Sequence, residues 1–480
     1  MRVSRRRFLS SILALPFVGL FKPARSVLVL GAGLSGLSVA YELALRGYKV
    51  TVIEARDYAG GRVFTLRKPF LNNQYVELGG ELIGDGYKRF LKYAKDFSIE
   101  FEENQNPVET GGSVANPQRG ITSSAILKGR LFAVGTILNE NPYGLPEKET
   151  MDLPPAILFR HIASVVSELR TNPSKIFDYD RLSLADFLRK RGVSEQMIKL
   201  MNISLNYNSI ETVSMGGVLW DAVRRVSAGT KPIQIIGGND RITKALFENS
   251  VRLGVKFIFQ AEVKRISQNP SSVRVSFLKN GKVETVEADK IVCTIPFSVL
   301  REIIFEPNLP ESKAKAINEL AYTRITKVFL QAERAAWDER NLGAAIWTDT
   351  PCERIFNSAG KKGDKFGIFT IWTEGAGAEI PESMNDRERI VWGQREFVKA
   401  LPFMKGRIQR RATKSWTLDK YARGAYAHFK VGQLASLQPF LKTPVGRIHF
   451  AGEHTAEKMP GMEGALESAE RVVAEIDSGG

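Results

Sequence analysis

An α/β fold is predicted by a strand, a glycine-rich loop, a helix and a second strand that follow one another near the start of the chain. Residues 26–30 form a short apolar run, which is typical of a strand buried in a parallel sheet. Glycines interrupt the chain over 31–36, and apolar residues then recur at helical spacing over 37–46. A second apolar run, 48–53, ends at Glu54. This order of elements predicts a mainly parallel sheet covered by helices.

The glycine loop has the spacing G-x-G-x-x-G, and each glycine has a physical role. Gly31 permits a tight turn, Gly33 lets a pyrophosphate approach the backbone, and Gly36 lets the helix pack on the strand. The N-terminus of the helix that follows favours the charge of a phosphate. Glu54 lies 18 residues after Gly36 and can accept hydrogen bonds from a ribose. The sequence therefore predicts a Rossmann-like dinucleotide-binding domain.

The residues after the second strand favour FAD over NAD as the dinucleotide. From Glu54 to Arg62 they read E-A-R-x-x-x-G-G-R, which resembles the continuation of the glycine loop in flavoproteins and is not usual in NAD dehydrogenases. Arg62 is permanently charged and can pair with the FAD diphosphate through two nitrogens. Arg56 and Gly61 belong to the same run.

The far end of the chain reads as a second part of the same site. A strand is expected at 447–450, and a helix is expected over 465–476. Between them, the carboxylate of Glu453 can bond ribityl or ribose hydroxyls. Small residues at the start of that helix suit a bound anion, such as the reduced flavin ring.

These motifs, with Leu78-Gly79-Gly80 and F-A-G-E-H-T…M-E-G-A, resemble the flavin amine oxidase family over nearly all of 26–477. That family includes monoamine oxidases, polyamine oxidases and L-amino-acid oxidases. The resemblance implies FAD-dependent oxidation of a C–N bond by hydride transfer to flavin N5. The imine then hydrolyses to a carbonyl product and ammonia or an amine, with H2O2 if oxygen is the acceptor. The implied cofactor contacts are Gly31, Gly33, Ser35, Gly36, Glu54, Arg56, Gly61, Arg62, Gly79, Gly80, Glu81, Val263, Glu453 and Met462.

The resemblance also implies three catalytic residues. Lys327 matches a lysine that hydrogen-bonds flavin N5 through water, and a lysine inside an apolar strand is costly unless it is paired. Tyr426 matches an aromatic wall that faces the flavin, and Trp416 matches a residue that packs beside the ring. Ala425 stands where covalently flavinylated monoamine oxidases carry Cys. Because Ala cannot form a thioether, we expect non-covalent FAD.

The substrate pocket departs from the family at two positions. Gly461 stands where a second aromatic wall is expected, so either the pocket is wider or a ring such as Trp220 fills the gap. Glu81 lies in the segment where many amino-acid oxidases of the family place an arginine for the substrate carboxylate. We therefore expect an amine or a cationic substrate such as a dibasic amine or basic amino acid, unless Glu81 bonds the cofactor instead.

Other functions remain open at this level. One alternative is an L-amino-acid oxidase of basic or bulky amino acids, and another is an enzyme like tryptophan 2-monooxygenase. A third is a flavin amine dehydrogenase that passes electrons to a cytochrome or quinone rather than to oxygen. A fourth is a non-catalytic FAD-binding protein.

The chain is too long for one ordinary core, and we expect a discontinuous arrangement of two domains. The FAD-binding domain is expected at 26–78, 229–297 and 440–480, and an α+β substrate domain at 79–228 and 298–439. Within the latter, 151–226 are expected to form a helical lobe, in which Ser183 with Asp186 resembles a helix cap and Gly192 suits a helix end. The dipeptide Asn280-Gly281 predicts a β-hairpin.

Residues 1–25 read as an export signal. The sequence Ser4-Arg5-Arg6-Arg7-Phe8-Leu9 and the modest apolar stretch after it resemble a twin-arginine signal. That route carries folded proteins, which suits a cofactor loaded before export by the twin-arginine machinery. No clean Ala-x-Ala site precedes residue 26, so both cleavage and retention of this segment stay open.

The composition indicates a soluble globular protein with a basic surface. Net charge is +16, and six positive residues among the first 25, without an acid, leave +10 for the rest. No basic helix interleaved with aromatic residues indicates nucleic acid, although an acidic partner or anionic surface is a second reading of the charge. No apolar run reaches the ~20 residues of a membrane-spanning helix. Two cysteines and four histidines show no metal-ligand spacing.

Overall fold

A five-stranded parallel sheet brings both ends of the chain together in the computed structural model, which describes residues 25–103, 124–132, 141–150, 153–203 and 205–478. The strand order is β10-β2-β1-β14-β23, and every neighbouring pair is parallel. The bounds are β1 Ser26–Leu30, β2 Lys49–Ile53, β10 Lys256–Ile258, β14 Lys290–Cys293 and β23 Ile448–Phe450. This arrangement confirms the predicted α/β fold. Of the predicted export signal, all but Arg25 lies outside the described residues.

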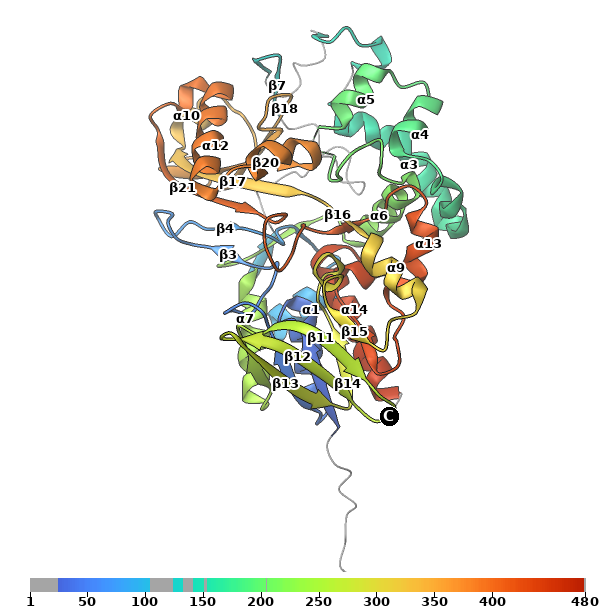
Figure 1. Cartoon of the computed structure of the whole chain (residues 1–480). Coiled ribbons are helices and arrows are strands. Elements are labelled where there is room, and N and C mark those ends of the chain that lie inside the picture. The colour runs from blue at the N-terminus through green and yellow to red at the C-terminus, as the bar shows by residue number, and fades with distance from the viewer. Residues whose placement is uncertain (1–24, 104–123, 133–140, 151–152, 204, 479–480) are drawn as a thin grey trace, which may run out of the picture.

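Helix α1 (Leu34–Leu45) packs against both α7 (Asp240–Arg252) and α14 (Gly461–Ser478) beside this sheet (Figure 1). The predicted helix began at residue 37, but the structure starts it three residues earlier, because the amide of Leu37 donates to the carbonyl oxygen of Gly33 at 2.9 Å. The C-terminal helix also begins earlier than predicted, at residue 461 rather than 465.

A four-stranded sheet in the lower part of Figure 1 contains the predicted hairpin. Its order is β13-β12-β11-β15, with bounds β11 Glu262–Gln268, β12 Val273–Lys279, β13 Lys282–Ala288 and β15 Ile304–Glu306. Asn280 and Gly281 both have positive φ, 50° and 75°, as a two-residue turn between twisted strands requires.

A seven-stranded sheet forms the other large part of the molecule (Figure 1). Its order is β21-β17-β20-β19-β18-β7-β8. The bounds are β7 Ser124–Leu127, β8 Arg130–Phe132, β17 Ile325–Glu333, β18 Ala345–Thr348, β19 Arg354–Ala359, β20 Phe366–Glu374 and β21 Ile408–Ser415. Helices α10 (Ala335–Asp338) and α12 (Asp386–Ala400) lie near β17, β20 and β21 in Figure 1. The central strand β17 is buried over eight of its nine residues.

The predicted helical lobe is present as four α-helices. They are α3 Pro154–Thr171, α4 Leu184–Lys190, α5 Glu195–Met201 and α6 Met215–Ser227. The predicted cap is also found, because the Ser183 hydroxyl accepts a hydrogen bond from the amide of Asp186 at 3.0 Å. Gly192, predicted at a helix end, has a φ of +72° there.

Short elements connect these parts. The small sheets are β3-β4, β5-β9-β6 and β16-β22, with bounds β3 Thr65–Leu66, β4 Val76–Glu77, β5 Ile83–Gly84, β6 Phe101–Glu103, β9 Pro232–Ile235, β16 Ala321–Tyr322 and β22 Ala427–His428. The remaining α-helices are α2 Lys88–Asp96, α8 Phe297–Leu300, α9 Glu311–Glu319, α11 Glu379–Glu382 and α13 Gln433–Leu441. Strands β9 and β15 each pair with strands from the other side of a predicted domain boundary, so two sheets bridge those boundaries.

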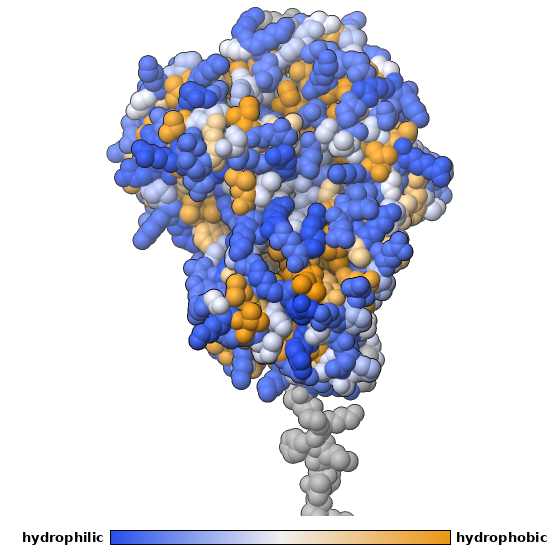
Figure 2. Space-filling model, in the orientation of Figure 1, coloured by the Kyte–Doolittle hydropathy of each residue, from blue (hydrophilic) through white to orange (hydrophobic). Residues whose placement is uncertain are grey.

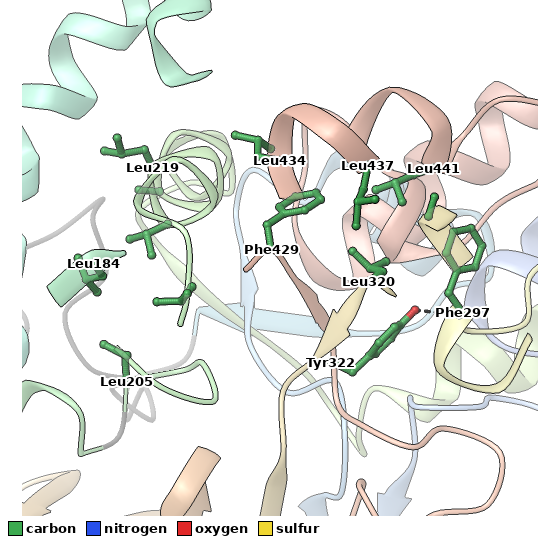
Figure 3. Close-up of a cluster of buried hydrophobic side chains, with 14 of the residues drawn as sticks. Leu184, Leu205, Leu219, Phe297, Leu320, Tyr322, Phe429, Leu434, Leu437 and Leu441 are labelled. Atoms are coloured by element: carbon green, nitrogen blue, oxygen red, sulfur yellow. Dashed lines mark hydrogen bonds between the residues drawn. The ribbon is translucent and has the colours of Figure 1, made fainter. Parts of the chain in front are cut away.

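A large hydrophobic cluster joins the helical lobe to the rest of the chain. Figure 3 shows Leu184 and Leu219 of the lobe in the same cluster as Leu437 of α13 and Leu320. At its edge, the amide of Phe297 donates to the hydroxyl of Tyr322 at 2.9 Å. On the outside, the face drawn in Figure 2 is largely hydrophilic, with hydrophobic residues in small groups. No described helix is long and apolar enough to cross a membrane.

Candidate active site

A cavity of about 640 Å³ runs between the parallel sheet, the seven-stranded sheet and the helical lobe. The glycine loop, Glu54, Glu453 and the start of α14 line one part of it. Lys327 of β17 and several residues of the lobe line another part. Segments far apart in the sequence therefore meet at one site. The described residues contain no group of histidine, cysteine, aspartate and glutamate side chains that could hold a metal ion.

The glycine loop fits a bound pyrophosphate. A Cβ atom on Gly33 would meet no atom within 4 Å, so the backbone there faces open space in the cavity. A Cβ on Gly36 would lie 2.0 Å from the carbonyl oxygen of Gly31, so only glycine allows the loop to fold back on the helix. Ser35 is buried beside them and also lines the cavity. The loop therefore leaves open space for a pyrophosphate at Gly33 and packs tightly onto the helix at Gly36.

The carboxylate of Glu54 is held against the loop. Its Oε2 accepts a hydrogen bond from the amide of Ala32 at 2.6 Å, and its Oε1 accepts one from the amide of Arg56 at 2.8 Å. Burial raises the pKa of Glu54, and these backbone amides act against that rise. The side chain lines the cavity at the end of β2, where a ribose is expected.

The two predicted cofactor arginines are both engaged with carboxylates of this chain. Arg56 forms a two-nitrogen pair with Asp419, at 2.5 and 3.1 Å. Arg62 donates to Glu453 at 3.0 Å and to the backbone carbonyl of Ala425 at 2.6 Å. Sequence reasoning did not assign Asp419, although it lies between Trp416 and Tyr426, which were both assigned. Arg62 therefore links the flavoprotein motif near the start of the chain to Glu453, the cofactor residue predicted near its far end.

Lys327 is buried and lines the cavity, although most other residues of its strand are apolar. Its Nζ lies 3.0 Å from Oε2 of Glu81 and donates to the backbone carbonyl of Glu77 at 3.2 Å. The ammonium also lies 4.1 Å from the ring centroid of Trp372, its partner across the β17–β20 pair. The pair with Glu81 lowers the cost of burying this cation. Sequence reasoning missed Trp372, because only the strand register brings the two residues together.

Trp416 and Tyr426 are fixed by hydrogen bonds from their polar ends. The indole nitrogen of Trp416 donates to the carbonyl of Leu78 at 2.8 Å, and the ring packs on Gly79, where a Cβ would lie 2.8 Å from it. The hydroxyl of Tyr426 donates to the carbonyl of Asn206 at 3.0 Å. Both aromatic residues line the cavity, on the side of β17 and β20.

The position of the missing aromatic wall carries no side chain, and the hydroxyl of a different tyrosine, Tyr87, lies beside it. Gly461 has a φ of +57°, and a Cβ there would lie 3.3 Å from the hydroxyl of Tyr87. Met462 packs against Gly80, because a Cβ atom added to Gly80 would lie only 2.7 Å from the sulfur of Met462. Trp220 lines a second, small pocket rather than this cavity, so the structure places it away from the gap.

Val263 and the remaining predicted contacts lie along the same cavity. Val263 is nearly buried on β11, beside an irregularity in its pairing with β12, and lines the cavity. Gly61, Gly79 and Gly80 also line it. All the predicted cofactor residues except Gly36 therefore line one space. Trp220, which was predicted for the substrate pocket, lines the second, small pocket instead.

A charge cluster behind Tyr426 supports the segment that holds its hydroxyl. Arg354 pairs with Glu374 at 2.6 Å and donates to Oδ1 of Asn206 at 3.2 Å. Glu353 accepts a hydrogen bond from the amide of Glu374 at 2.8 Å. Burial first, and the carboxylate of Glu374 second, raise the pKa of Glu353 to about 8. The cluster is buried, so its charges act at close range.

Glu353→Gln is expected to stabilise the protein at high pH. The pKa of this carboxyl rises from 4.5 to about 8 on folding, so stability is present at low pH and is lost as the pH rises from about 5 through about 8. An amide cannot ionise, and the variant should therefore exceed the wild type by about 2 kcal/mol at pH 9 and match or fall below it at pH 5. Thermal unfolding at both pH values measures this. A Tm difference that does not change with pH contradicts it.

The last turns of α6 bring a second charged group to the cavity, which sequence reasoning missed. Asp221 pairs with Arg224 at 3.0 Å and with Arg225 at 2.8 Å, and the hydroxyl of Tyr207 donates to it at 3.3 Å. All four residues line the cavity. The spacing of i, i+3 and i, i+4 along a helix is the signal that predicts such pairs.

Comparisons with known proteins agree with this site. Residues 34–477 match the family described as flavin containing amine oxidoreductase, and the chain belongs to that family. It is 28% identical to an L-amino-acid oxidase of Sistrurus catenatus edwardsii, over 90% of this chain and 83% of that protein. It is 27% identical to a putative L-amino-acid oxidase of Bacillus subtilis (strain 168), over 94% and 95% of the two chains.

Solved structures share the fold. Cyclohexylamine oxidase from Brevibacterium oxydans IH-35A has a TM-score of 0.76 and 20% identity, covering 95% of this chain and 99% of that one. A putrescine oxidase bound to putrescine has a TM-score of 0.74 and 19% identity, with the same coverage. The protein is thus a flavin-dependent oxidoreductase that acts on CH–NH2 or CH–NH groups, as the motifs at both ends of the chain predict.

Proposed function

We propose that the protein binds FAD non-covalently and oxidises the C–N bond of a primary or secondary amine group, with oxygen as the electron acceptor. The observation that supports this most is the single cavity that holds the glycine loop, Lys327 and Tyr426. The bound flavin supplies a two-electron acceptor for the hydride equivalent of the carbon that bears nitrogen. Oxygen is proposed because the proteins to which this chain is similar are named as oxidases.

The chain's own residues position the substrate and exclude water. Tyr426 and Trp372 offer aromatic surface beside the buried Lys327, and a dry surface of this kind disfavours an ammonium, so an amine enters its neutral, reactive form. Lys327 is held by Glu81 and can order a water at the cavity wall, where a proton is needed or released. The imine product is released to water and hydrolyses to a carbonyl compound and ammonia or an amine.

Anaerobic bleaching of the flavin tests this function. The purified yellow protein is mixed without oxygen with a panel of amines and amino acids, and loss of the absorbance near the flavin maximum is followed. At least one member of the panel should bleach the protein, and air should then restore the colour with formation of peroxide. A protein that no compound bleaches has the flavin site without the proposed reaction, and slow recovery in air with fast recovery by a dye indicates a dehydrogenase.

The flavin of the native protein is expected to leave the chain completely on acid precipitation. Ala425 lines the cavity and offers no side-chain atom that can form a thioether. Trichloroacetic acid should therefore leave all of the yellow colour in the supernatant and none in the pellet. Chromatography of the released flavin beside FAD and FMN standards identifies whether it is the dinucleotide. Colour that stays with the washed pellet contradicts the non-covalent proposal.

We also propose that residues 1–25 direct export by the twin-arginine machinery, to the periplasm or the extracellular space. The support is the paired arginines before Phe8 and Leu9. Cell fractionation of the full chain and of an Arg5→Lys/Arg6→Lys variant tests this, with the flavin-loaded variant expected to stay in the cytoplasm. Equal distribution of the two proteins contradicts it.

A further inference from the structure

The last turn of α6 presents a partly free guanidinium group to the cavity. Nε of Arg225 donates to Asp221 at 2.8 Å, whereas its Nη1 and Nη2 make no hydrogen bond with any residue that the structure describes. The side chain is 40% exposed and lines the cavity. Arg224 differs, because its two terminal nitrogens donate to Asp221 at 3.0 Å and to the carbonyl of Ala456 at 3.4 Å. Arg225 therefore offers two donors to a ligand.

The described residues that pair with this group do not balance its charge. One carboxylate, Asp221, pairs with two guanidinium groups, so these three side chains together carry one net positive charge. Burial alone would raise the pKa of Asp221, but the charges of Arg225 and Arg224 outweigh burial and hold that pKa below its ordinary value. Lys327 and Glu81 already form a pair, so they cancel each other. An anionic group on the ligand would supply the missing charge.

Arg225 lies near the aromatic residues that surround the reacting end of the cavity. Burial first, and Glu374 second, raise the pKa of Tyr426 well above its ordinary value, and the charge of Arg225 acts against them. Burial raises the pKa of Tyr87 to about 12, and Arg225 opposes that rise as well. The hydroxyl of Tyr87 adjoins Gly461, and Arg225, Tyr87, Tyr426 and Gly461 all line the same cavity.

Apolar side chains of the helical lobe line the cavity on the same side. They are Leu158, Phe159, Ile162, Met201, Leu205 and Val218, from α3, α5, α6 and the segment between the last two. An apolar surface of this kind binds a large apolar group and excludes water. The same space therefore combines the partly free guanidinium of Arg225 with an apolar wall.

We propose that Arg225 anchors the carboxylate of the substrate, and that the substrate is an α-amino acid with a large apolar side chain. The planar guanidinium can bind a carboxylate through its two free nitrogens, and Asp221 is the positioning residue that holds it in place. This inference rests on the proposed amine oxidation. It replaces the expectation of a cationic substrate, because the charge of Glu81 is taken up by Lys327.

Matched substrates separate carboxylate binding from the chemistry. Arg225→Met and the wild type are compared on pairs of an amino acid and its decarboxylated amine, such as leucine with isopentylamine and phenylalanine with 2-phenylethylamine. The variant should lose about 100-fold or more in kcat/KM for the amino acid of each pair and change by less than about 3-fold for the amine. Arg225→Lys should recover part of the loss, since it keeps the charge without the planar fork. Equal loss on both members, or no loss on either, overturns the proposal.

A binding measurement without turnover completes the test. The oxidised FAD-loaded protein is titrated with 3-phenylpropanoate, which carries the carboxylate but no amine, and the flavin absorbance is followed. Arg225→Met should raise its Kd by about 30-fold or more, and Arg189→Met, which removes an exposed arginine of the same lobe, should leave it unchanged. If the wild type is bleached by amines alone and binds no carboxylate, amine oxidation stands and the Arg225 proposal fails. If carboxylate binding depends on Arg225 but nothing bleaches the flavin, the proposed function fails and the anion site stands.

Discussion

Lys327→Met should lower turnover by about 100- to 1,000-fold while leaving flavin content unchanged. The ammonium of Lys327, on strand β17, is buried in the wall of the cavity beside the ring of Trp372. A positioned proton donor or acceptor of this kind contributes on the order of 100- to 10,000-fold. Steady-state kcat and the separate rates of anaerobic reduction and air reoxidation measure the effect, with Lys327→Arg as the variant that keeps the charge.

The same substitution should also reduce stability, and a second variant separates the two effects. Removing Lys327 leaves the carboxylate of Glu81 without its 3.0 Å partner, which costs roughly 2–4 kcal/mol at a largely buried site. The double variant Lys327→Met/Glu81→Gln removes both charges, so it should recover most of the Tm but none of the turnover. A double variant that regains wild-type turnover makes the lysine a structural partner of Glu81 and contradicts the catalytic role.

Gly33→Ala should abolish FAD retention without destabilising the apoprotein. Gly33 has a φ of −74°, which any residue adopts, and an added Cβ would meet no atom of the chain within 4 Å. The methyl group would instead occupy the open space that a pyrophosphate needs, close to the helix N-terminus. Flavin content after purification should fall by about tenfold or more, while the Tm of the flavin-free protein should stay within about 2 °C of the flavin-free wild type.

Gly36→Ala provides the matched comparison on the same loop. Its Cβ would lie 2.0 Å from the carbonyl oxygen of Gly31, so the loop and α1 must shift. This variant should therefore lose both flavin and apoprotein stability, whereas the change at Gly33 affects flavin alone. Normal flavin content in Gly33→Ala would show that the dinucleotide does not approach this backbone.

Local patterns predicted the parts of the site that lie in one stretch of chain. The strand, loop, helix and acid from residue 26 to Glu54 are confirmed, because each depends on short-range rules of apolar spacing and glycine geometry. The hairpin at Asn280 and the cap at Ser183 are confirmed for the same reason. Helix starts were less accurate, since the first turn of α1 consists of loop residues that carry no apolar periodicity.

Partnerships between distant segments were not predictable in the same way. The sequence offered Glu81 as a free negative charge near the flavin, and the structure pairs it with Lys327, 246 residues away. Trp220 was a candidate for the missing wall, yet the helix α6 turns it to a different pocket. Both outcomes depend on which faces of β17 and α6 meet, and neither residue carries a local signal of its partner.

The sequence by itself determined the class of protein, because motifs near both ends of the chain indicate one flavin site. Each motif is short and contiguous, and its steric requirements are met by only a few residue types. The tertiary structure alone decided the electrostatics of the cavity. A charge acts on a ligand only if no neighbour neutralises it, and neighbours across the fold are set by strand register and helix packing. Glu81 is thereby paired with Lys327, and Arg225, on a helix that showed no motif, lines the cavity with its charge only partly neutralised, which is why we propose it for the substrate carboxylate.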